Sequence, residues 1–187
     1  MLIIRPFLES DISLVKLFAD QAIGQNYYSE VELLEKQKQS IADNQLISSF
    51  VLYDQNENSV KGIRLAFPPG RWSEGKGAKL RSDLWPYSIK ETGYFQSLFL
   101  SQEVQGQGWG PKLSEESLKV FKKLGAKGIA THSWKESPNN SSVKYLTKMG
   151  FKPIIEHKNY WIDVDYVCTY DGKPCYCTAI GMYKIIE

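Results

Sequence analysis

A glycine-rich segment, Gln105-Gly106-Gln107-Gly108-Trp109-Gly110, has residue types that can hold a phosphate group. It follows an apolar run at residues 94–100 and precedes a helix-period pattern that begins at Pro111. Glycines let the backbone turn sharply and approach a ligand closely. The N–H groups at the start of a helix attract anions. The order of strand, glycine turn and helix therefore predicts a pyrophosphate site, although a loop that only turns the chain would have the same composition.

Pro111 argues against two common nucleotide-binding patterns. The dinucleotide pattern G-x-G-x-x-G, started at Gly106, needs a glycine where Pro111 stands. The lysine-bearing phosphate loop fails because Gly110 is followed by proline instead of lysine. The segment does match Gln/Arg-x-x-Gly-x-Gly/Ala, through Gln105, Gly108 and Gly110.

This pattern resembles the acetyl-coenzyme A loop of the GNAT superfamily of N-acetyltransferases. Two more segments, in the right order, look like the same family. Residues 139–151 open with Asn and end in Gly-Phe, and residues 3–11 look like the start of the first strand and helix. The resemblance covers most of the chain. It implies one α/β domain, residues 1–187, with a central mixed, mostly antiparallel sheet flanked by helices.

The resemblance also implies a reaction, the transfer of acetyl from acetyl-coenzyme A to a primary amine by direct attack. The backbone from Gln105 to Gly110 would then hold the pyrophosphate, with the Gln105 side chain bracing the loop. Leu98 and Leu100 would border the pantetheine arm, besides packing in the core. Asn139 matches the family's cofactor-binding asparagine, whereas Asn140 suits a helix cap.

Acetyl transfer needs a base for the amine, and an acid can protonate the leaving thiolate. Many GNAT proteins have this acid as a tyrosine four residues before the glycine of Gly-Phe. That position is Leu146 here, and the tyrosine lies one residue earlier, at Tyr145, rotated by about 100° on a helix. We predict Tyr145 as the acid and Glu103 as a second catalytic residue. The alternatives for the base are Glu91, Glu136 and His132, and each glutamate also fits a solvated surface position.

The displaced tyrosine leaves a second hypothesis open, a non-catalytic module that binds or senses acyl-coenzyme A. Nucleotide binding through the same glycines is a weaker third. The acceptor stays unidentified, since a polyamine, an antibiotic, an amino acid and a protein amine all fit.

Composition excludes several classes of protein. The chain has 187 residues and a net charge of +2, which gives no electrostatic basis for nucleic acid or an anionic membrane as the main partner. No apolar run approaches the ~20 residues of a membrane helix. The apolar start is cut short by Arg5 and Pro6, unlike a secretory signal. We therefore expect a cytoplasmic protein, and the resemblance allows a homodimer.

Three cysteines lie near the C-terminus, at Cys168, Cys175 and Cys177, with Asp171 between them. An odd count without a signal peptide favours a reducing compartment. Zinc takes thiolates and sometimes a carboxylate. However, a strong zinc pattern would have two Cys-x-x-Cys pairs. The spacing therefore allows zinc but favours buried or free thiols, and we predict no metal.

Periodicity and turn residues predict the order of elements. Strands are expected at residues 2–7, 47–53, 60–66, 94–100, 128–132, 154–164 and 176–185. Helices are expected after caps at Ser10 and Ser29, from Pro111 to Gly125, and at residues 138–149. The apolar residues expected to face the core on the first two helices are Leu14, Val15, Leu17, Phe18, Val31, Leu33, Leu34 and Ile41.

An irregular segment at residues 67–92 contains Gly75 and Gly77 as well as three large aromatic side chains, Trp72, Trp85 and Tyr87. A loop of this length in a compact domain is usually functional or mobile. Its aromatic residues would either form a wall of an acceptor pocket or cover an edge of the core.

Overall fold

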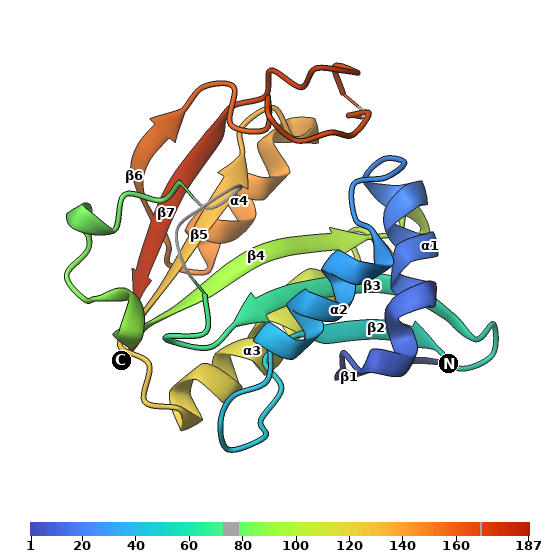
Figure 1. The fold of residues 1–187 in the computed structure, drawn as a ribbon, viewed down its shortest axis with the longest axis horizontal. Helices are drawn as coiled ribbons and strands as arrows, with labels where there is room; N and C mark the ends of the chain where they lie inside the picture. Colours follow the sequence, from blue (N-terminus) through green and yellow to red (C-terminus); the bar gives the residue numbers. More distant parts are fainter. Residues whose placement is uncertain (73–78, 169) are drawn as a thin grey trace.

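Seven strands form one sheet in the computed structural model, which describes residues 1–72, 79–168 and 170–187. Gly75 and Gly77 lie outside the described residues. The strands are β1 (Leu2–Pro6), β2 (Phe50–Asp54), β3 (Ser59–Phe67), β4 (Thr92–Leu100), β5 (Gly128–Trp134), β6 (Lys152–His157) and β7 (Ala179–Ile185). Their order in the sheet is β1-β2-β3-β4-β5-β7-β6 (Figure 1). Each neighbouring pair is antiparallel except β4 and β5.

Helices cover both faces of this sheet (Figure 1). They are α1 (Ile12–Ala22), α2 (Glu30–Gln39), α3 (Trp109–Lys123) and α4 (Ser141–Lys148). Alternate residues of β2 show the two faces: Val51 is buried with α1 and α2, whereas Phe50 and Leu52 are buried with α3. Leu146 of α4 shares a buried cluster with Phe121 of α3. The predicted fold class, a mixed and mostly antiparallel sheet flanked by helices, is confirmed.

Several local predictions were wrong. The strand predicted at residues 154–164 is β6, which ends at His157, and β7 begins at Ala179 instead of residue 176. The aromatic run after β6 reads as a strand, yet Tyr160 and Trp161 are buried in a local cluster with the three cysteines. On the helices, Leu17 and Val31 were predicted to face the core, but they are 58% and 68% exposed.

The two predicted helix caps had different outcomes. Ser29 caps α2, since its Oγ accepts a hydrogen bond from Glu32 N at 3.1 Å. Ser10 does not cap α1, because the turn before that helix is held by Asp11. The Asp11 carboxylate accepts the Leu8 N–H at 2.9 Å and pairs with Arg5 at 2.6 Å.

The start of β2 was also placed too early, at residue 47 instead of Phe50. The two serines before Phe50 form hydrogen bonds to β3 with their side chains, where a strand would form them with its backbone. Ser48 Oγ and Ser49 Oγ donate to the Ala66 carbonyl at 2.6 and 3.0 Å, so that carbonyl of β3 is already satisfied.

The central feature for function is an opening in the sheet between β4 and β5. Their pairing ends at Phe95 and Thr131, although β4 continues to Leu100 and β5 to Trp134. Beyond that point β4 stays paired with β3, and β5 stays paired with β7. A shift in the β3–β4 register leaves Gln96 opposite no residue of β3. The two strands diverge from there, as Figure 1 shows.

Among the described residues, no helix is both long and apolar enough to cross a membrane.

Candidate functional site

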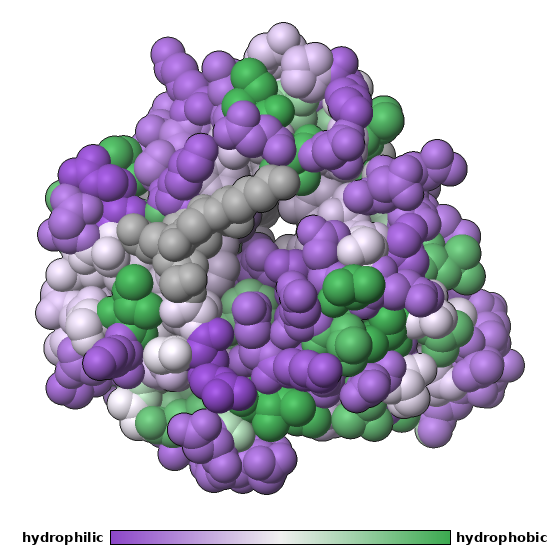
Figure 2. Space-filling model, viewed as in Figure 1, coloured by the Kyte–Doolittle hydropathy of each residue, from purple (hydrophilic) through white to green (hydrophobic). Residues whose placement is uncertain are grey.

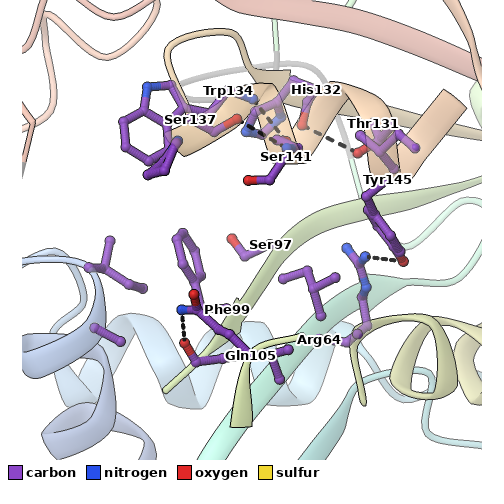
Figure 3. Close-up of a pocket in the computed structure, with 18 of the residues that line it drawn as sticks. Arg64, Ser97, Phe99, Gln105, Thr131, His132, Trp134, Ser137, Ser141 and Tyr145 are labelled. Carbon is purple, nitrogen blue, oxygen red and sulfur yellow. Dashed lines mark hydrogen bonds between the residues drawn. The ribbon is translucent and has the colours of Figure 1, made fainter. Parts of the chain in front are cut away.

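A cavity of about 780 Å³ lies where β4 and β5 diverge. Figure 3 shows its two walls. Ser97 and Phe99 of β4 lie on one side, and His132 and Trp134 of β5 lie on the other. The start of α4 extends the second wall, and Figure 2 shows an opening on this face of the molecule. The sequence predicted residues on both walls.

The predicted glycine loop lies at the mouth of this cavity and leads into α3. Gly108 takes a left-handed conformation at φ 81° and precedes the first residue of α3, while Gly106 has φ 75°. These values favour glycine over residues with a side chain. A β-carbon on Gly110 would lie 3.3 Å from Leu98 Cδ2, so glycine also allows α3 to approach β4 closely. Pro111 is the third residue of α3, within its first turn, where proline is tolerated.

Two glutamine side chains brace the loop. Gln105 Nε2 donates to the Leu100 carbonyl at 3.0 Å, and Gln107 Nε2 donates to the Glu103 carbonyl at 2.8 Å. Four of the six loop residues line the cavity, and Gln107 and Trp109 do not. The Trp109 ring instead lies under the Lys112 ammonium, 4.6 Å from the ring centroid. Any contact of these two residues with a cofactor would therefore come from the backbone.

Leu98, Leu100 and Asn139 also line the cavity. Asn139 and Asn140 both have left-handed backbones, at φ 55° and 54°. Asn140 occupies the N-cap position of α4, but its side chain makes no capping bond. The hydroxyl of Ser137 accepts the Ser142 N–H instead, at 3.0 Å.

Tyr145 lines the cavity, and its hydroxyl is held by two residues that the sequence did not single out (Figure 3 shows Tyr145 and Arg64). Its OH is hydrogen-bonded to Ser114 Oγ. Arg64, on β3, donates to the Tyr145 OH at 3.3 Å and from Nε and Nη2 to Ser114 Oγ at 3.0 and 2.8 Å. Ser114 lies on α3, so this contact joins three elements at one end of the cavity.

Arg64 is 2% exposed and lines the cavity. Burial lowers the pKa of its guanidinium from the usual value, but arginine stays protonated in proteins. Its charge lies 4.4 Å from the ring centroid of Phe95, and no carboxylate of the described residues forms a salt bridge with it. The sequence contains one signal that could have indicated Arg64 as a site residue, which is its charge within an apolar strand pattern.

The glutamates considered as bases do not line the cavity. Glu103 is paired with Lys61 at 2.7 Å, and this hydrogen bond lowers its pKa. Glu91 is paired with Lys127 at 2.6 Å. Glu136 accepts the Thr178 N–H at 2.9 Å. The geometry therefore gives no support to Glu103 as a proton acceptor.

The other end of the cavity is aromatic. It is lined by Tyr27, Phe99, Trp161 and Tyr166. The rings of Tyr27 and Tyr166 meet edge to face with centroids 4.7 Å apart. The sequence placed aromatic residues for such a wall in the 67–92 segment, and of these neither Trp72 nor Trp85 lines the cavity.

Trp72 instead covers the core, which is the second role that the sequence allowed for the aromatic residues of this segment. Its indole Nε1 donates to the Thr92 carbonyl at 2.8 Å, and its ring stacks on Tyr94 with centroids 4.7 Å apart. Trp85 packs against the same cluster.

The side-chain oxygen of Gln96, a residue of the cavity wall, is buried without a hydrogen-bond partner among the described residues, whereas the Trp134 indole interacts with the Cys177 side chain. Buried polar groups in proteins are nearly always paired.

His132 lines the cavity between its two ends. Its Nδ1 is hydrogen-bonded to the Tyr94 hydroxyl at 2.9 Å, and its ring lies against Tyr160 with centroids 4.9 Å apart. Burial, with a smaller effect from His157, lowers the pKa of His132 to about 4. The imidazole is therefore neutral at neutral pH and a weak base.

Comparison with known proteins decides the family. The model of the Acetyltransferase (GNAT) family matches residues 43–151, more than half of the chain. The chain belongs to the GNAT family of acetyltransferases. The matched residues run from before β2 to the Gly-Phe after α4, and so include the glycine loop and both cavity walls. No curated protein sequence matches the chain.

Solved structures of GNAT proteins share the fold. The ribosomal-protein-S18-alanine N-acetyltransferase of Escherichia coli has a TM-score of 0.68 at 15% identity, covering 100% of this chain and 95% of that one. Arabidopsis thaliana NAA60 in complex with acetyl-CoA has a TM-score of 0.68 at 16% identity, covering 100% and 99%. A phosphinothricin acetyltransferase from Sinorhizobium meliloti in complex with AcCoA has a TM-score of 0.66 at 17% identity, covering 99% and 88%.

The buried imidazole predicts a loss of stability in acid. Unfolding returns the pKa of His132 from about 4 to about 6.5. Between these pH values the imidazole binds a proton in the unfolded chain but not in the folded domain. The free energy of unfolding therefore falls as the pH drops. The loss should reach at most about 3–4 kcal/mol, since one pKa unit is worth about 1.4 kcal/mol. Urea unfolding at a series of pH values measures it.

His132→Asn is the matched variant, because an Asn oxygen can still accept from the Tyr94 hydroxyl. The difference in unfolding free energy between wild type and variant should change with pH only below about 6.5. A difference that stays constant from pH 7 to pH 4 would contradict the assignment.

Proposed function

We propose that this protein transfers the acetyl group of acetyl-coenzyme A directly to a primary amine. The observation that carries the proposal is the opening between β4 and β5, which begins beside the glycine-rich start of α3. The N–H groups from Gly106 to Gly110 are suited to bind the pyrophosphate, because they lie at a helix N-terminus and no β-carbon blocks them. The cavity then extends from this loop along β4.

The edge of β4 that faces the cavity suits the pantetheine arm. Residues 96–100 have no strand partner on that side, since β5 has separated. The pantetheine arm contains amide groups, which can pair with a free strand edge as a peptide does. N–H groups of the same edge would be available to the oxyanion that forms when the amine attacks the thioester carbonyl.

Tyr145 is the acid that the geometry supports. It lines the cavity, and its hydroxyl accepts a hydrogen bond from the buried cation Arg64 and donates one to Ser114, so the O–H would turn from Ser114 to the sulfur to act as the acid. As the C–S bond breaks, the sulfur takes the bonding electron pair and Tyr145 would supply a proton to it. The positive charge of Arg64 stabilises negative charge on either the sulfur or the phenol oxygen. Arg64 and Ser114 are thus positioning residues.

The lining also restricts the acceptor. None of the described lining residues is Asp or Glu, and Arg64 contributes a positive charge. A polyamine or aminoglycoside would bring several positive charges into this cavity with no carboxylate to pair with them, which is costly. The aromatic end suits an acceptor that has one reactive amine and an apolar or flat body.

A second candidate function is a module that binds acyl-coenzyme A without catalysis. The observation in its favour is that no carboxylate base lines the described part of the cavity. Thioester consumption, followed by thiol release in the presence of a panel of amines, separates the two. Release above the rate of solvent hydrolysis supports the enzyme, and release equal to hydrolysis with every amine supports the binding module.

The acceptor restriction predicts the order of activity within that panel. Monoamines with an aromatic or aliphatic body, including peptide N-termini, should give a higher kcat/KM than spermidine or an aminoglycoside. We expect kcat/KM to be at least about tenfold higher for the monoamines. A cost of 1.4 kcal/mol for bringing an unpaired charge into the cavity already corresponds to that factor. A polyamine as the best acceptor would overturn this restriction while leaving acetyl transfer itself intact.

Gly108→Glu should weaken acetyl-coenzyme A binding by about 100-fold or more. A carboxylate would enter the proposed pyrophosphate position, and a loss of 2.7 kcal/mol corresponds to that factor. Calorimetric titration measures the affinity. Wild-type protein should bind one equivalent with micromolar or tighter affinity.

Gly125→Glu is the matched control for backbone strain. Gly125 also has a left-handed backbone, at φ 70°, and open space around its β-position, but it follows the opposite end of α3. Both variants thus place glutamate in the same unfavourable conformation. Equal affinity for the cofactor in the two variants would refute the loop assignment.

Tyr145→Phe should lower kcat by about 10- to 100-fold and leave the acetyl-coenzyme A affinity within a factor of about two, as expected for the loss of a general acid. Tyr183→Phe is the control, since it removes a buried hydroxyl that is hydrogen-bonded to Thr92 Oγ1 at 3.0 Å and lies outside the cavity lining. Its kcat should be unchanged. If Tyr145→Phe retains full kcat, Tyr145 is not the acid.

A further inference from the structure

Four metal-binding side chains converge between β6 and β7, in residues 158–178. Each residue offers one ligand atom, and these four atoms all lie within 4.8 Å of one another. They are the sulfur atoms of Cys168, Cys175 and Cys177 and a carboxylate oxygen of Asp171. The three cysteines are buried and unpaired by disulfides, and Asp171 lies on the exposed side. We propose that this cluster binds one zinc ion through three thiolates and one carboxylate.

The separations are close to those of a bound site. With Zn–S bonds of about 2.3 Å and tetrahedral angles, neighbouring ligand atoms lie roughly 3.5–4 Å apart. A small inward movement of side chains therefore closes the site. Binding would release the thiol protons to solvent. The ion would then have four protein ligands and no open position, as in structural zinc sites.

The backbone around the cluster already orients two of the ligands. Cys168 and Gly172 exchange two backbone hydrogen bonds, at 2.9 and 3.0 Å, which closes a tight turn around Asp171. Within this turn the Tyr170 N–H donates to Cys168 Sγ at 3.4 Å. The Tyr176 N–H donates to Asp171 Oδ2 at 2.8 Å. Donors to the ligand atoms stabilise the deprotonated forms that a metal requires.

A third ligand is oriented by a side chain. The Tyr166 hydroxyl donates to Cys175 Sγ at 3.2 Å. All four ligands therefore come from one short segment whose turn and hydrogen bonds bring them to one point. The sequence spacing alone favoured buried or free thiols, because it could not show this convergence.

A metal also explains how the segment keeps its shape. The described residues between 158 and 178 contain no helix and no strand of the sheet. Segments that cannot build a regular core commonly depend on a disulfide or a metal ion. A disulfide would use two of the cysteines and leave a buried third beside Asp171, whereas zinc uses all four groups.

The proposed ion would lie beside the aromatic end of the cavity. Cys168 and Cys177 line that end, together with Trp161 and Tyr166. In Figure 1 the segment lies near the loop between α1 and α2, and the contact of Tyr166 with Tyr27 joins the two. Zinc would therefore hold one wall of the acceptor end; this consequence, unlike the metal site itself, rests on the proposed function.

Metal content is the first test. Untagged protein, purified without chelator under reducing conditions, should contain about one equivalent of zinc by mass spectrometry of the elements. Structural zinc binds tightly enough to survive purification. Less than about a tenth of an equivalent, or stoichiometric iron or copper in its place, would overturn the proposal. Cys177→Ser should lose the zinc.

Cobalt substitution tests the ligand set without relying on activity. Co²⁺ in place of zinc should give thiolate charge-transfer bands and the strong visible bands of tetrahedral cobalt. Asp171→Cys should raise the charge-transfer intensity by about a third, because the number of sulfur ligands rises from three to four. Asp163→Cys is the matched control, since Asp163 is an exposed acid of the same segment outside the cluster. It should leave the intensity unchanged, and equal spectra for the two variants would overturn Asp171 as a ligand.

The effect on the acceptor wall is measured separately. Removal of zinc should raise the KM of the amine several-fold and leave the acetyl-coenzyme A affinity unchanged. Zinc present with an unchanged KM would refute the role in the acceptor wall alone. Zinc absent from active enzyme would refute the metal site alone, and the proposed acetyl transfer would stand.

Discussion

The early end of the β4–β5 pairing is the constraint on which the rest of the site depends. Backbone N–H and C=O groups in a protein interior need partners. Here β5 keeps β7 and β4 keeps β3, while the two inner edges separate after Phe95 and Thr131. The bulge at Gln96 occurs at the same point and bends β4 away. The sheet thus remains continuous at one end, and at the other the edge of β4 has no strand beside it, which is where a ligand with amide groups can replace a strand.

The closed end of this opening contains a group that a purely structural core would avoid. Arg64 is a buried cation with neutral partners, the hydroxyls of Ser114 and Tyr145 and the ring of Phe95. A buried charge without a counter-charge is destabilising. Under the proposed mechanism this charge has a use, because a departing thiolate or a phenolate would supply the missing negative charge during turnover. The cost in stability and the benefit in catalysis then have the same source.

How much of the site could be predicted from the sequence follows from the range of the interactions. The glycine loop depends on neighbours in the chain, so Gly106, Gly108 and the brace from Gln105 to Leu100 were all accessible to local reasoning. The contact of Arg64 with Tyr145 joins β3 to α4, and no local pattern contains it. The segment after β6 misled the prediction for the same reason, since its apolar residues are buried against the cysteines and not in the sheet.

The two ends of the cavity differ in the kind of structure that forms them, and this difference separates the two binding tasks. The proposed cofactor end is built from β4, α3 and α4, whose geometry is set by many hydrogen bonds and by the core beneath them. The proposed acceptor end is formed largely by Tyr27, in the loop between α1 and α2, and by Trp161 and Tyr166, in the segment after β6. Irregular segments can change their side chains and their path at small cost to the sheet. A fold of this kind keeps one cofactor while its acceptor varies, provided that the irregular wall is itself held rigid. The convergence of three cysteines and an aspartate in that wall would supply the rigidity that its backbone lacks.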